Sequence, residues 1–192
     1  MTTEGTRVGR NVAIADATVE AIDLGLQTLS LVDGDTNLAE GDSVNVSITL
    51  FREAAFDNLL GFYVADEITG AVTDADGNTF APTDDRLAYA QAAYNNAVAN
   101  GATFEPPANE STVGIELPNL VVGNLILPFI ISNSDTPASD FSNVYFPFLE
   151  LNYDRVDHIR LLGNGVFGFE DLPGGGDQDF DDIIATITSV TV

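Results

Sequence analysis

The sequence predicts a mainly β protein: an antiparallel β-sandwich, jelly-roll-like, with one short helix on its surface. Short apolar segments separated by turn residues recur along most of the chain, as two packed sheets require. One stretch alone, residues 84–99, has helical spacing instead. The chain has 192 residues, 45% of them hydrophobic, which predicts a single domain, 1–192, with a buried core.

The first half of the chain contains the first predicted strands. Residues 12–32 are largely apolar, and GDSVNVSITLF at 41–51 alternates apolar and polar residues after a Gly-Asp turn. Another strand is predicted at 59–66, LLGFYVAD. Asp76-Gly77 is a strong tight-turn signal and predicts a hairpin between two short β segments.

The helix predicted at 84–99 has clear start and stop signals. Thr83 is the expected N-cap, acids occupy the first turn, and Asn100-Gly101 provides the stop. An amphipathic helix lying on a sheet buries one face. The residues expected on that face are Leu87, Ala90, Tyr94, Ala97 and Val98.

Beyond Pro106-Pro107 the chain again has the pattern of strands. Turn residues separate these segments, and 132–142 is expected to be a long surface loop. The predicted strands are 113–117, 124–132, 144–152, 158–163, 166–171 and 182–192.

The charge balance narrows the classes of partner. The net charge is −24, from thirty acids against six arginines and no lysine, which argues against nucleic acid and anionic membrane surfaces. No segment is long and apolar enough for membrane insertion or for a signal peptide. Such repulsion requires salt or bound cations, and a chain without cysteine must hold a metal through oxygen. Calcium or magnesium is therefore expected.

The acids are densest in FGFEDLPGGGDQDFDDII, residues 167–184. Asp177 is expected to begin a new strand, so a turn that folds back would bring carboxylates from both strand ends together. This mixture of oxygen ligands predicts a calcium (Ca²⁺) site, and the alternative is a solvated acidic hairpin. The candidate ligands are Glu170, Asp171, Asp177, Asp179, Asp181 and Asp182.

Three consecutive glycines lie inside this segment. Gly174, Gly175 and Gly176 allow tight or left-handed backbone and leave room for a ligand to approach the metal, so they are candidate ligand-binding residues. A second, weaker metal candidate is the DADGN turn, with Asp74, Asp76 and Asn78; the alternative there is a simple β-turn.

The segment FGFEDLPGGGDQDFDD resembles the signature F-x-F-E-D-L-x-x-G-G-D-x-D-[FY]-N-D of an uncharacterised bacterial domain family. Such domains lie near the C-terminal ends of RTX-type adhesins and other large secreted proteins. The resemblance covers most of residues 59–188 and implies a secreted or cell-surface β-sandwich that binds calcium. Asp181 departs from the signature, which has Asn at this position.

The leading hypothesis is an extracellular calcium-binding module of a bacterial adhesin or of a surface or biofilm-matrix protein. Calcium would stabilise the fold and could also hold a peptide carboxylate or the hydroxyls of a glycan on a cell surface. One alternative is a self-assembling subunit of an extracellular fibre, in which a segment such as IATITSVTV pairs with another copy of the chain.

An enzyme is not expected, and no catalytic residue is assigned. The single histidine, His158, has neighbours typical of a structural or surface residue, and no Ser-His-Asp or Cys-His arrangement is evident. The remaining enzymatic alternative is a metal-dependent or carboxylate-pair hydrolase.

Overall fold

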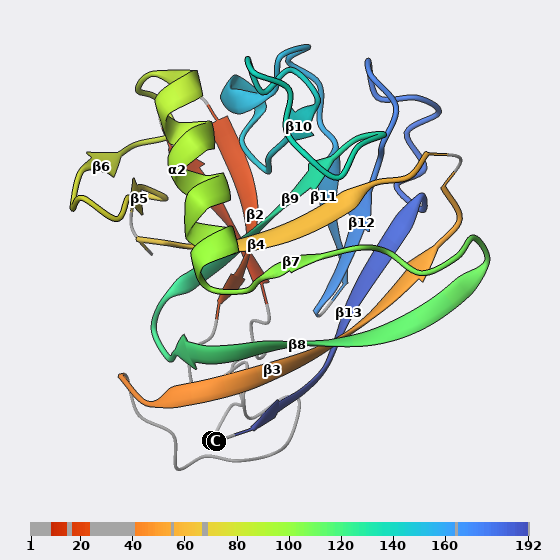
Figure 1. The fold of residues 1–192 in the computed structure, drawn as a ribbon, viewed down its shortest axis with the longest axis horizontal. Helices are drawn as coiled ribbons and strands as arrows, with labels where there is room; N and C mark the ends of the chain where they lie inside the picture. Colours follow the sequence, from red (N-terminus) through yellow and green to blue (C-terminus); the bar gives the residue numbers. More distant parts are fainter. Residues whose placement is uncertain are drawn as a thin grey trace.

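The computed structural model describes residues 41–54, 56–66, 69–163 and 165–191 with their side chains, and the backbone of 9–14 and 17–23. The described residues contain two antiparallel sheets packed face to face, with one α-helix on the outside (Figure 1). The predicted mainly β sandwich is confirmed.

The first sheet has six strands in the order β1-β2-β9-β4-β7, with β10 also paired to β9. Its strands are β1 (Gly9–Ile14), β2 (Ala17–Asp23), β4 (Leu59–Ala65), β7 (Thr103–Phe104), β9 (Leu125–Ile131) and β10 (Val144–Tyr145). Of the predicted segment 12–32, residues 24–32 lie outside the described residues.

The second sheet has five strands in the order β11-β12-β13-β3-β8. They are β3 (Ser43–Arg52), β8 (Ser111–Val121), β11 (Ile159–Gly163), β12 (Val166–Phe169) and β13 (Ile183–Thr191). The predicted Asp76-Gly77 turn is confirmed as well, because it joins the small hairpin of β5 (Val72–Thr73) and β6 (Thr79–Phe80).

The main core lies between the two sheets. Alternate residues of β3, from Val44 to Leu50, are at most 1% exposed and pack with β4 and β9 residues such as Phe62 and Ile130. Every residue of β9 is buried, because its other face is covered by the helix and by the segment around Phe146. The protein therefore has three layers: a five-stranded sheet, a six-stranded sheet and a helical layer.

The helix α2 (Arg86–Ala99) starts and packs differently from the sequence prediction. Asp85 is the N-cap in place of Thr83, and its carboxylate accepts a hydrogen bond from the Ala88 N–H at 2.8 Å. The predicted buried face is partly wrong, since Leu87 and Val98 are 43% and 49% exposed. The buried residues are Tyr89, Ala90, Ala92, Ala93 and Ala97, because small side chains let the helix approach the sheet closely.

One predicted strand, 144–152, is shorter than expected. Only Val144–Tyr145 of the segment 144–152 pairs as a strand, and Leu149–Leu151 is a 3₁₀ turn. The Asn152 side chain bonds both the N–H and the C=O of Phe146, which takes the place of a neighbouring strand. None of the helices formed by the described residues is long and apolar enough to cross a membrane.

The acidic segment also differs from the prediction. The strand expected from Asp177 begins only at Ile183, and the preceding residues form a loop. Gln178 and Phe180 adopt left-handed backbone, with φ of 62° and 60°, and this conformation cannot continue a strand. Phe180 still anchors the loop, because it is 1% exposed.

Candidate metal centre

The acidic loop joins two neighbouring antiparallel strands. Phe169, the last residue of β12, is the partner of Ile183, the first residue of β13. Glu170 and Asp171 therefore lie across from Asp182 at the same end of the sheet. The Asp171 N–H donates to the Asp182 carboxylate at 2.8 Å, and this bond draws the three acids together.

Two groups of three carboxylates could hold a metal ion among the described residues, and in each group one oxygen per residue lies within 4.8 Å of the others. The inner group is Glu170, Asp171 and Asp182. The outer group is Glu170, Asp177 and Asp179, so Glu170 is common to both. Glu170 and Asp171 are each 1% exposed, whereas Asp177 and Asp179 are exposed.

Asp171 has one carboxylate oxygen without a partner. Its Oδ2 accepts a hydrogen bond from the Asn58 side-chain amide at 2.8 Å, while its Oδ1 is buried and has no hydrogen bond. The Phe56 N–H lies near this carboxyl and lowers its pKa. A buried oxygen without a donor costs free energy, and the carboxylate that carries this one is grouped with two further carboxylates.

The negative charges of the inner group are not balanced by positively charged side chains of the described residues. Burial, followed by repulsion from Asp182, raises the pKa of Glu170 to about 7. Burial also raises the pKa of Asp171, and Asp182 adds to the shift. The salt bridges among the described residues do not involve the inner group. A bound cation is the natural compensation for three such carboxyls.

The three glycines fit the loop beneath Glu170. Gly174, Gly175 and Gly176 all have positive φ, and a Cβ at Gly176 would lie 2.2 Å from Glu170 Oε1. A Cβ at Gly175 would meet Val156 at 2.6 Å, whereas a Cβ at Gly174 would have open space. The room expected for an approaching ligand is thus present at Gly174 only. A ligand contact at these glycines stays a prediction.

A histidine and an aspartate clamp the loop from outside the acidic segment. His158 is fully buried, and its Nδ1 donates to the Glu170 carbonyl at 2.8 Å. Its Nε2 lies 3.0 Å from Asp154 Oδ2, which also accepts the Gly174 N–H at 2.8 Å. Burial alone would raise the pKa of Asp154, but the Gly174 N–H and the His158 ring hold it below its ordinary value.

Both ring nitrogens of His158 therefore have partners within the fold, the Glu170 carbonyl and the Asp154 carboxylate. His158 is therefore structural, as one of the two expected alternatives had it. Sequence reasoning missed Asp154, Asn58 and Ser132, whose hydroxyl donates to the Asp171 carbonyl at 2.6 Å. Only Asp154 carried a signal, its position four residues before the single histidine.

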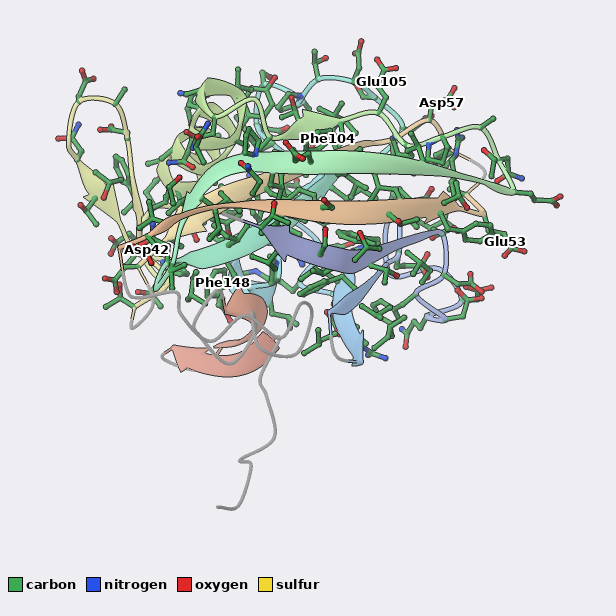
Figure 2. All side chains as sticks on the ribbon, turned by 90° about the horizontal axis from the view of Figure 1, so that it is seen from below. Asp42, Glu53, Asp57, Phe104, Glu105 and Phe148 are labelled. Carbon is green, nitrogen blue, oxygen red and sulfur yellow. The ribbon has the colours of Figure 1, made fainter. Side chains whose placement is uncertain are left out.

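Asp181 is the remaining predicted ligand in the acidic loop. Asp181 belongs to neither group, and its pKa is raised to about 6 by burial and by Asp179, with a further contribution from Glu53. Figure 2 shows Glu53 at one end of the sandwich.

The DADGN turn uses its own oxygens internally. Asp74 accepts the N–H groups of Asp76 and Asn78 and the Asn78 amide, and hydrogen bonds with Asn78 lower its pKa. This arrangement is that of an Asx-type β-turn, and neither metal group of the described residues includes Asp74 or Asp76.

The comparisons with known proteins found one similarity, to a family of unknown function. Residues 120–190, from the end of β8 through most of β13, match a family described as a domain of unknown function (DUF4114). No curated protein and no solved structure matches the chain. The matched stretch contains the whole acidic loop and the His158–Asp154 pair, so the candidate metal centre lies within the part of the chain that is similar to this family.

Proposed function

We propose that this protein is a calcium-binding β-sandwich module in which the inner group holds the ion. The observation that carries the proposal is the buried Asp171 Oδ1, which has no hydrogen bond and belongs to a carboxylate grouped with those of Glu170 and Asp182. An oxygen with no donor, next to two more anionic ligands, fits a hard cation. Asp177 and Asp179 can add oxygens from the solvent side.

The donor set favours calcium over other metals. It is all oxygen, the chain has no cysteine, and both nitrogens of the single histidine already have acceptors. Calcium takes six to eight oxygens in irregular geometry, and opposite ligands around it lie about 4.6–5.2 Å apart. Magnesium demands a tighter octahedron and keeps several waters. An irregular loop that offers several carboxylates suits calcium better.

Metal binding would act on the fold through the ends of two strands. Glu170 and Asp171 follow β12, and Asp182 precedes β13, so one ion held by all three joins the strands where their ladder ends. The Asp182 carbonyl also accepts the Glu53 N–H just after β3, which extends the connection to a third strand. The free energy of binding then becomes free energy of folding.

The setting we propose is extracellular, in an adhesin or a surface or matrix protein of a bacterium. The net charge of −24 and the resemblance of residues 167–182 to a signature found in secreted proteins support this. For the fibre alternative, residues 184–186 of its stated segment are paired with both β12 and β3, whereas residues 189–191 are paired with β3 alone. This alternative stays a prediction.

A thermal melt tests the metal proposal. Extracellular modules bind calcium with Kd values of about 10⁻⁴–10⁻³ M, so about 10 mM calcium should raise the Tm by several degrees over the protein in chelator. Magnesium at the same concentration controls for simple screening of charge and should give a clearly smaller rise. Equal midpoints in calcium and in chelator would rule the proposal out.

A further inference from the structure

A pocket of about 480 Å³ lies beside the metal centre. Three aromatic residues, Phe56, Tyr145 and Tyr153, contribute to its lining, together with Pro173 from the acidic loop. Its volume is in the range typical of small-molecule sites, and such sites combine apolar walls with a few polar groups.

Two of the aromatic residues are fixed in place. The Tyr145 ring is 2% exposed and stacks on His158, with centroids 3.5 Å apart and planes within 8°. Tyr153 is 64% exposed, yet the Arg86 guanidinium lies 5.7 Å from its ring centroid, and Arg86 also donates to the Asp140 carbonyl. A large exposed ring held by a neighbour is a ready platform for a ligand with an apolar face.

The polar groups of the pocket are mostly uncharged. The Asn133 side chain and the hydroxyls of Tyr145 and Tyr153 form no hydrogen bond within the described part of the chain, and burial raises the pKa of Tyr145 to about 12, which keeps its hydroxyl neutral. These groups can both donate and accept hydrogen bonds. They suit a ligand that carries several hydroxyls.

The charges around the pocket argue against an anionic or a cationic ligand. Asp154 is the one charged residue among the described residues of the lining, and it already pairs with His158. An anionic ligand would meet this carboxylate on a protein of net charge −24. A cationic ligand on Tyr153 would meet the positive charge of Arg86, which already lies against that ring.

We propose that this pocket binds a neutral sugar, with one face of the pyranose ring on Tyr153 and hydroxyls bonded to Asn133 and Tyr145. The sugar would lie beside the metal centre and need not touch the ion. The inference deepens the proposed function and rests on it only for the calcium dependence described next.

Several residues that line or adjoin the pocket also contact the acidic loop of the metal centre. Pro173 belongs to the acidic loop, Asp154 accepts the Gly174 N–H, and the lining residue Ser132 donates to the Asp171 carbonyl. Asn58 bonds the Asp171 carboxylate and also accepts the Asn133 N–H at 2.9 Å. Calcium that fixes the acidic loop therefore also fixes the pocket, and we expect sugar affinity to rise about fivefold or more with calcium.

Saturation-transfer NMR on the full chain tests this inference with four probes: the methyl glycosides of glucose, galactose, mannose and fucose. At least one should bind in calcium, and Tyr153→Ala should weaken it about tenfold. Leu162→Ala, which truncates a side chain 49% exposed and absent from the pocket lining, is the matched control and should bind normally. Methyl glucuronide, which is anionic, should not bind.

The outcomes separate the two proposals. Three results would each overturn the sugar site, even if calcium raises the Tm. They are that none of the four neutral glycosides binds, that Tyr153→Ala binds as well as the parent protein, or that the glucuronide is preferred. If Tyr153→Ala weakens sugar binding but calcium does not change the Tm of the parent protein, the sugar site is supported and the metal site is refuted. The Tm of Tyr153→Ala in calcium should match that of the parent protein, since the ring is exposed.

Discussion

Replacing Asp171 with asparagine should abolish the stabilisation by calcium and stabilise the calcium-free protein. The amide keeps the shape of the carboxylate, and its oxygen can still accept the hydrogen bond from Asn58. Its NH₂ group takes the place of the unpartnered Oδ1 and can donate to the neighbouring carboxylates of Glu170 and Asp182. We therefore expect the variant to be more stable than the parent protein in chelator and to gain nothing from calcium.

The stabilisation of Asp171→Asn in chelator and the stabilisation of the parent protein by calcium have different origins. A buried polar atom without a partner costs about 1–3 kcal/mol, so Asp171→Asn should gain about 1 kcal/mol in chelator. For the parent protein, about 10 mM calcium and a Kd of about 10⁻⁴–10⁻³ M give about 1.4–2.7 kcal/mol. In a chain of this length, that raises the Tm by about 3–10 °C.

Differential scanning calorimetry of both proteins, in calcium and in chelator, measures both effects. Asp181→Asn is the matched control, because it makes the same chemical change at an exposed residue outside both metal groups. The control should keep the full calcium response. A full response in Asp171→Asn, or a loss of response in Asp181→Asn, would refute the assignment of the inner group.

The calcium-free protein should lose stability as pH rises. Burial raises the pKa of Glu170 from 4.5 to about 7, so between these values the folded chain holds a proton that the unfolded chain has released. Urea melts in chelator should show a fall of at most about 3 kcal/mol across this range, and a flat profile would contradict the burial of this group. Gly176→Ala should weaken calcium binding in titration calorimetry, because its Cβ would lie 2.2 Å from Glu170 Oε1. Gly174→Ala has the same left-handed strain without a neighbour, so equal losses would remove the role of Glu170. Asn58→Ala should destabilise the protein by about 1–3 kcal/mol in chemical denaturation, since it leaves a second Asp171 oxygen without a donor. An unchanged midpoint would show that water replaces the amide.

The fold was largely predictable because its strands alternate in the ordinary way. Val44, Val46, Ile48 and Leu50 all face the core, as their spacing indicated. The helix was harder, since alanine gives no strong sign of which side is buried. Tyr89, which is fully buried among the rings of Tyr63, Phe146 and Phe148, decides the orientation of α2 through contacts distant in sequence.

The sequence predicted which residues of the acidic loop are candidate ligands, but it did not predict how the loop arranges them. The spacing of its acids predicted Glu170 and Asp171 as candidate ligands. Both are buried, and their burial depends on residues that no local sequence pattern connects with them. Asn58 lies 113 positions before Asp171 in the sequence, and Ser132 lies 39 positions before it. The separation of the acids into inner and outer groups follows from the left-handed residues in the loop, since an extended strand from Asp177 would have carried its carboxylates away.

The place of β13 in its sheet has a consequence for the order of folding. Residues 43–52 of β3 find both of their neighbours, β8 and β13, much later in the chain. Sheets built from such distant pairings close slowly, because the long intervening loops must be ordered before the contacts form. The turn that must bring β13 beside β12 is the like-charged loop itself, so in low calcium it opposes this late step. If calcium binds as we propose, the protein should therefore fold faster in calcium than in chelator.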